Sequence, residues 1–255
     1  MLVPSMTYKE MYDNLDMDYE KIKIKIDQLK SKAIKRLRKV HVFPAVEMFS
    51  YRIPSSNNLY NIFFYAGSRD SIDNPIADFY CIFPIEKKKF YIRWIAGGYR
   101  HTPASDIELV RQLHVYTHHF FARYNERIMN GLDRCMDIIA CLYFGRNREM
   151  IPIKVSEEIN RNYDKYGFGG RQAFRVKDGV CFTRSTVEGT MDEVDANNDR
   201  VDSLCFVYTT FMNESSMSMV QRRAINNEHL LAMSNFIKTS SNAYHMRLGQ
   251  FLLKS

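Results

Sequence analysis

One histidine and two arginines stand four residues apart in the chain, at His119, Arg123 and Arg127. On a helix, residues four apart differ by only about 40°, so the three side chains would share one face. An imidazole can move a proton near neutral pH, and guanidinium groups can hold a phosphate and stabilise the charge that develops on it. The spacing therefore predicts a metal-independent site for transesterification at RNA phosphate. His119 would be its general acid or base, and Arg123 and Arg127 its phosphate clamps.

A helix has to position these three residues. Thr117 can cap a helix that runs from His118 to about Asn130, with Gly131 near its end. Phe120, Phe121 and Tyr124 would supply its apolar contacts. An ordinary surface helix, with Glu126 paired to Arg123, explains the same residues without any chemistry.

This H-x-x-x-R-x-x-x-R helix resembles the barnase/RelE-like toxin ribonucleases, most closely their BrnT-type branch, over about residues 118–211. The resemblance implies that a small antiparallel sheet follows the helix. Its candidate strands are Arg171–Val176, Val180–Val187 and Ser203–Phe211. The last strands of that pattern contribute hydroxyl or basic groups, which implies supporting roles for Arg184, Ser185 and Thr209. No metal and no cofactor are expected in such a site.

A zinc hydrolase is a lesser alternative. His114 and His118 are four residues apart, which suits two ligands on one helix face. The residue after His114 is Val115, so the glutamate of an H-E-x-x-H motif is missing, and no third ligand is evident.

The positive charge of the chain is concentrated in one segment. Lysine and arginine outnumber aspartate and glutamate by 36 to 29, and Tyr19–Val40 holds nine cations against two carboxylates, so the remaining chain is neutral. Such a segment could hold phosphates or an acidic partner, or it could be a solvated helix face. The candidate nucleic-acid-binding residues are Lys21, Lys25, Lys32, Lys35, Arg36 and Lys39.

A second class of function follows from the same charge. The chain could be a non-enzymatic nucleic-acid-binding or assembly protein from a phage or mobile element. RNA or another nucleic acid, a protein partner or a second copy of the chain are the expected partners, and a membrane is not.

The apolar patterns predict an α+β protein in which an antiparallel sheet, or two separate sheets, pack with helices. A stripe through Ile22, Ile26, Leu29, Ala33 and Leu37 predicts a long basic helix near the N-terminus. We expect a basic helical segment over residues 1–45 and one α+β domain over 46–255. Further strands are expected at Leu59–Tyr65, Phe79–Pro84 and Lys89–Ala96. Further helices are expected at Ser105–His114, Leu132–Phe144, Glu214–Ile225 and Glu228–Ile237.

Composition limits the cellular setting. Hydrophobic residues make up 45% of the chain, which is typical of a folded protein. The five cysteines are odd in number and form no C-x-x-C pair, which argues against a disulfide framework and a zinc finger. Met1–Asp13 lacks the features of a signal peptide, and the longest apolar stretch, Met136–Phe144, is too short to cross a bilayer. These features predict a cytoplasmic protein.

Overall fold

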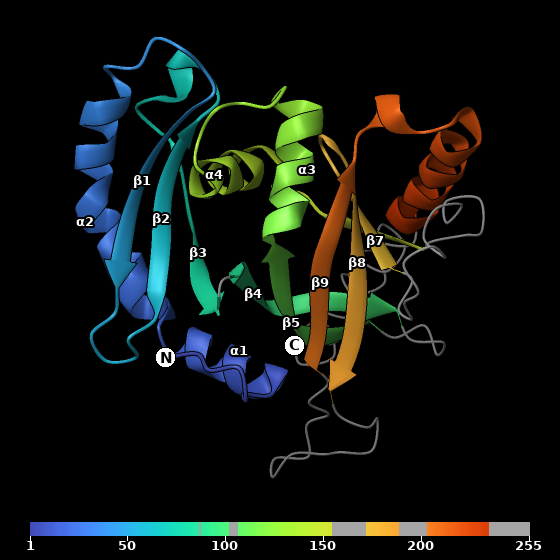
Figure 1. Ribbon diagram of the computed structural model, residues 1–255, viewed down its shortest axis with the longest axis horizontal. Coiled ribbons are helices and arrows are strands. Elements are labelled where there is room, and N and C mark those ends of the chain that lie inside the picture. Colours follow the sequence, from blue (N-terminus) through green and yellow to red (C-terminus); the bar gives the residue numbers. More distant parts are fainter. Residues whose placement is uncertain (87, 102–106, 155–171, 189–202, 235–255) are drawn as a thin grey trace, which may run out of the picture.

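A computed structural model describes residues 1–86, 88–101, 107–154, 172–188 and 203–234 (Figure 1). Nine strands in these ranges form one sheet in the order β1-β2-β3-β4-β5-β9-β8-β7-β6. All neighbours are antiparallel except β5 and β9, which are parallel. The predicted α+β class is confirmed, and the strands belong to one continuous sheet.

The first half of the sheet is an antiparallel meander. It consists of β1 (Ala45–Arg52), β2 (Leu59–Ala66), β3 (Ile76–Ile85), β4 (Lys88–His101) and β5 (Ile107–Thr117). The expected strands at 59–65 and 79–84 lie within β2 and β3, whereas β1 was not predicted. The expected end of a strand at Gly97 was wrong, because β4 continues to His101. The register of β4 against β5 shifts between Ile95 and Gly98, so the two glycines form an irregularity within the strand and do not end it.

The expected helix at Ser105–His114 was wrong. Residues 105 and 106 lie outside the described ranges, and Ile107–Thr117 is the strand β5. Hydrogen bonds to β4 on one side and β9 on the other place β5 inside the sheet. Residues 112–116 are consecutively buried, since both faces of this strand are covered. Ile107, Val110 and Leu113 recur at three-residue spacing, which is also the pattern of an amphipathic helix.

The second half of the sheet is a smaller meander. It consists of β6 (Ile151–Lys154), β7 (Gln172–Val176), β8 (Gly179–Glu188) and β9 (Ser203–Met212). The predicted hairpin around Lys177-Asp178-Gly179 is confirmed, because β7 pairs with β8 from Gln172↔Thr183 to Val176↔Gly179. The expected strand at 203–211 is β9. The path of the chain therefore returns to the centre of the sheet, where β9 joins β5.

Two helices fill the inner side of the sheet. Figure 1 shows α3 (His118–Ile128) and α4 (Met136–Arg146) between β1 and β2 on one side and β7, β8 and β9 on the other. Their buried side chains share one aromatic cluster with residues from β2, β3, β4, β5, β7, β8 and β9. The sheet therefore curls around α3 and α4.

The remaining helices cover the outer face. α1 (Tyr8–Asp16) and α2 (Tyr19–Leu37) pack there against side chains of β1 to β5 and β9. α2 contains the segment predicted as a basic helix. A helix over residues 219–234 packs against β6, β7 and β8 through Ile225, and Met217, just before the helix, joins the same cluster. The division of the chain at residue 45 stays a prediction.

One helix replaces the two that were expected at 214–225 and 228–237. Glu214–Ser216 is a 3-10 turn. Ser218 then accepts from the amide of Gln221 (3.2 Å), and the Gln221 side chain accepts from the amide of Ser218 (3.0 Å). This reciprocal cap starts the helix, and asparagines at 226 and 227 do not interrupt it. Residues 235–237 lie outside the described ranges. In the part of the chain that is described, no helix combines the length and apolar character of a membrane span.

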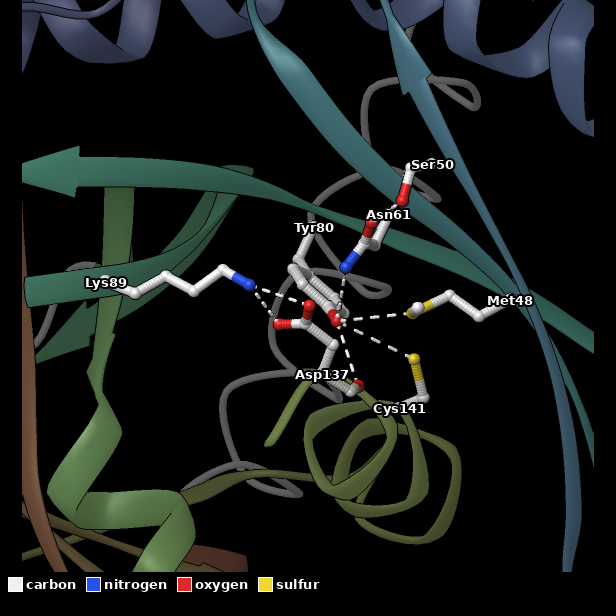
Figure 2. Close-up of polar contacts among 7 residues, drawn as sticks. All are labelled: Met48, Ser50, Asn61, Tyr80, Lys89, Asp137 and Cys141. Atoms are coloured by element: carbon white, nitrogen blue, oxygen red, sulfur yellow. Dashed lines mark hydrogen bonds and ion pairs between the residues drawn. The ribbon is translucent and has the colours of Figure 1, made fainter. Parts of the chain in front are cut away.

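A polar network connects α4 to the sheet (Figure 2). The buried Tyr80 hydroxyl accepts from Asn61 (3.0 Å) and donates to the Asp137 carbonyl (3.0 Å), while Lys89 pairs with both carboxylate oxygens of Asp137 (2.6 and 2.7 Å). Ser50 donates in turn to Asn61 (2.8 Å). The first turn of α4 is thereby attached to four strands, and these groups satisfy one another.

At the other end of α4, Gly145 is in contact with Tyr65. A Cβ on Gly145 would lie 2.3 Å from Tyr65 Cγ and 2.8 Å from its Cβ, so the buried ring would have to move. Alanine in a helix interior normally stabilises by about 1 kcal/mol relative to glycine. Overpacking costs about 1–3 kcal/mol, so we expect Gly145→Ala to lower the free energy of unfolding despite its helix propensity.

Urea denaturation measures this change. Gly67→Ala is the matched control, because a Cβ there would meet only ordinary van der Waals contacts with Tyr65, the shortest 3.5 Å. A Gly145→Ala protein as stable as the wild type would contradict the close packing of Tyr65 on α4.

Candidate functional site

α3 forms where it was predicted and positions His119, Arg123 and Arg127. Thr117 caps it by accepting from the Phe120 amide (3.1 Å), and donates its own hydroxyl proton to the Tyr208 carbonyl on β9 (3.0 Å). Phe120, Phe121 and Tyr124 are buried in the inner cluster. The helical spacing places the three candidate residues along one side of α3, as the sequence predicted.

The three candidate side chains on α3 have different surroundings. His119 is exposed. Arg123 pairs with the Glu126 carboxylate at 2.7 Å, near the helix surface. Arg127 donates to the backbone carbonyl of Phe211 and so attaches α3 to the end of β9. Burial, and then the charge of Arg123, lower the pKa of Arg127. The two guanidiniums are therefore used in local and structural contacts.

The structure does not bring Arg184 to this side of the sheet. On β8, Val180 and Phe182 pack with Ile225 of the helix over 219–234 on the outer face, whereas Cys181 belongs to the inner cluster with α3. Strand alternation therefore directs Arg184 to the outer face, away from His119. Thr209 lies at a register irregularity between β8 and β9 and donates to the Phe182 carbonyl (3.4 Å). The placement of the Ser185 side chain lies outside what is described.

His114 and His118 do not form the zinc pair considered from the sequence. His114 belongs to β5 and His118 is the first residue of α3, where it is exposed. The His114 ring is buried, with Nδ1 2.7 Å from the Tyr208 hydroxyl and Nε2 3.2 Å from Gln112 Oε1. Both ring nitrogens are thus hydrogen-bonded inside the protein. In the described ranges, no three His, Cys, Asp or Glu side chains gather as metal ligands.

The basic residues of α2 have a different arrangement. At about 100° per residue, Lys21, Lys25, Lys32, Lys35 and Arg36 fall within a sector of about 100°. Ile22, Ala33 and Leu37, which are buried against the sheet, lie on a neighbouring sector. Lys39 follows the last turn of α2 and is exposed. We call these six cations the α2 basic face.

The α2 basic face lies beside β1, the edge strand of the sheet. Lys25 Nζ lies 5.1 Å from the centre of the Tyr51 ring. Lys32 Nζ and the Arg36 guanidinium lie 5.7 and 5.1 Å from the centre of the Phe49 ring. Both rings are half-buried, so cations and aromatic side chains share one surface. Phe49 and Tyr51 were not predicted as site residues because β1 was not expected; only its last residues, Phe49–Arg52, alternate between aromatic and polar side chains.

Few carboxylates neutralise this face. Arg36 pairs with Glu47 at 3.3 Å, and Lys21 donates to the Ser55 hydroxyl at 2.6 Å. Within the part of the chain that the structure describes, no carboxylate forms an ion pair with Lys25, Lys32 or Lys35. The charge of these lysines is therefore available to an anionic partner.

No family model matches the chain, and the searches of curated proteins and of solved structures give no match. The likeness to toxin ribonucleases stays a prediction, and the geometry around α3 does not favour it.

His114 generates a prediction on stability and pH. Burial, with a smaller effect from Arg93, lowers the pKa of His114 from 6.5 to about 3. The unfolded chain therefore binds a proton below about pH 6.5 that the folded protein excludes, so stability is full above this pH and falls with acidification. Between pH 7 and 5 the loss from this residue is about 2 kcal/mol.

We expect His114→Gln to show a smaller loss of stability between pH 7 and 5 in urea denaturation. His119→Gln is the control, because His119 is exposed and the acid-induced loss should persist. Equal pH dependence in the wild type and His114→Gln would show that His114 is not held neutral.

The arrangement on α3 generates a second prediction. Because Arg123 pairs with Glu126 and Arg127 donates to the Phe211 carbonyl, we expect an end-labelled RNA pool to stay intact with the protein in excess EDTA. The readout is gel analysis of wild type beside His119→Ala. Cleavage by the wild type that His119→Ala abolishes would restore the ribonuclease hypothesis.

Proposed function

We propose that this protein binds RNA through the α2 basic face without catalysing a reaction there. The observation that carries the proposal is that Lys25, Lys32 and Lys35 of this face have no carboxylate partner in the described structure. From Lys21 to Arg36 the row of cations extends about 22 Å along the helix, enough to meet several phosphates of one strand. The whole positive charge excess of the chain lies in Tyr19–Val40, the segment that contains this row.

The aromatic side chains of β1 support the same conclusion. Contacts with Tyr51 and Phe49 hold Lys25, Lys32 and Arg36 along the edge of the sheet. Positioned cations lose less conformational entropy when a phosphate binds. Proteins that bind single strands without sequence preference combine a cationic track with aromatic side chains on which bases stack. We therefore favour a single strand over a duplex as the ligand.

The α2 basic face is carried by a helix on the outer side of the sheet, whereas general acid-base catalysis needs groups positioned around a reacting atom. No histidine belongs to this face. Binding alone, dominated by phosphate contacts and dependent on salt, is the activity that its residues can provide.

Fluorescence anisotropy with a labelled uridine 20-mer at several KCl concentrations tests the proposal. We expect Lys25→Gln/Lys32→Gln/Lys35→Gln to weaken binding at least about tenfold. Each phosphate contact to a single strand contributes about 0.7 to the slope of log K against log salt, so the slope should become shallower by about two.

The control variant is Lys88→Gln/Arg134→Gln/Arg222→Gln, which removes the same charge from exposed positions outside α2. It should bind within about twofold of the wild type. Equal weakening in both variants would show that net charge alone attracts RNA, and no binding by the wild type would refute the proposal. A duplex of the same length, run in parallel, tests the preference for a single strand.

A further inference from the structure

A cleft of about 700 Å³ lies between the end of α4, β6, β7, the connection from β2 to β3 and the helix over 219–234. None of its lining residues comes from α2, so it is separate from the α2 basic face. Among the described residues, four cationic side chains line it against one carboxylate, Glu149. They are Arg146, Arg148, Arg175 and Lys177.

Arg146 is held in a fixed position by a carboxylate behind it. Its Nε and one terminal nitrogen donate to the two oxygens of Asp178, each at 2.9 Å. Tyr124 and Asn147 also donate to Asp178, at 2.7 and 3.0 Å. Burial opposes ionisation of Asp178, but the hydrogen bonds from Arg146, Tyr124 and Asn147 outweigh it and keep the pKa of Asp178 below its usual value. Asp178 is therefore charged, and it fixes a guanidinium that lines the cleft.

Arg175 is also held by a carboxylate, because it forms an ion pair with Glu214. Neither Asp178 nor Glu214 lines the cleft. Arg148 and Lys177 are exposed and have no ion pair among the residues described. The cleft thus combines two positioned guanidiniums with two cations that are available to a ligand.

The rest of the lining suits an organic group beside the anion. Tyr65, Ile76, Ile151 and Val176 supply an apolar wall, and Ser68 and Ser71 lie at its rim. His229 also lines the cleft, and its Nδ1 is buried with no hydrogen-bond partner in the described structure. A buried polar atom without a partner costs free energy, and a bound polar ligand would satisfy it.

We propose that this cleft binds a phosphomonoester whose organic part has the size of a nucleoside. Guanidiniums bind phosphate oxygens in bidentate fashion, and an arginine oriented beforehand by a carboxylate loses little entropy on binding. The volume lies within the range of about 300–1,000 Å³ that is usual for small-molecule sites. The cleft goes beyond the proposed RNA binding, since neither its residues nor its ligand depend on α2.

Isothermal titration calorimetry with adenosine 5′-monophosphate and uridine 5′-monophosphate tests the proposal, with adenosine and inorganic phosphate as comparison ligands. We expect at least one monophosphate to bind, and to bind at least tenfold more tightly than adenosine or phosphate alone. Arg148→Gln/Lys177→Gln should weaken that binding at least tenfold. Both side chains are exposed, so the variant should keep the melting temperature of the wild type.

Lys88→Gln/Arg134→Gln is the matched control and should bind the monophosphate within twofold of the wild type. The variant with three substitutions on α2 should also keep its affinity for the monophosphate, which separates this site from the RNA surface. No heat with either monophosphate at millimolar concentration would overturn the proposal. Unchanged affinity in Arg148→Gln/Lys177→Gln, or affinity lost only in the α2 variant, would also overturn it.

Discussion

The parallel pairing of β5 with β9 joins the two antiparallel halves of the sheet, and the rest of the structure depends on it. Two parallel strands cannot be joined by a tight turn, so the chain between them must form a long crossover. Here the crossover contains α3, α4 and the strands β6 to β8. At the junction, the rings of Tyr116 and Tyr208 stack with centroids 4.0 Å apart and planes at 13°. Because α3 starts directly after β5, this junction directs it onto the inner side of the sheet.

The inner cluster imposes a second constraint, because it is built largely of tyrosine and phenylalanine. Each buried tyrosine brings a hydroxyl that needs a partner. Tyr124 donates to Asp178, Tyr143 lies 3.0 Å from Cys181 Sγ, and Tyr208 lies 2.7 Å from His114 Nδ1. Burial raises the pKa of Tyr143 and of Tyr208 well above the usual value. The two tyrosine hydroxyls therefore stay protonated and hydrogen-bonded in the core. His114 is one of their partners, so its ring serves the packing of the core.

Local patterns in the sequence predicted the elements that have their own signals. The cap at Thr117 fixed the start of α3, and the Asp178-Gly179 turn fixed the β7–β8 hairpin. β5 was misread because Ile107, Val110 and Leu113 recur at helical spacing, and its neighbour β9 comes from a distant part of the chain. β1 was missed because only its last residues, Phe49–Arg52, alternate. Tertiary pairing, which the sequence does not display, decided both cases.

The same distinction applies to the candidate site. Helical spacing correctly placed His119, Arg123 and Arg127 on one side of α3, but it could not show that Arg127 would bond to the Phe211 carbonyl. Helical spacing also could not show that the side chain of Arg184 would lie on the outer face of the sheet. The lysines of α2 were identified as a cationic segment, whereas the aromatic side chains beside them depend on the position of β1.

What a cation can do is set by its partners more than by its spacing. Arg127 is used by the fold itself, since it satisfies a backbone carbonyl. Arg146 is held by Asp178, which neutralises part of its charge but fixes its direction toward a concave surface. Lys32 has a ring beneath it and no carboxylate partner among the described residues, so its charge remains available on an exposed helix face. An exposed helix face with available charge suits a long, flexible polyanion, and a cleft with oriented guanidiniums suits a small anion of defined shape. The α2 basic face and the cleft therefore differ in the size of anion that each can hold, although both rely on the same two residue types.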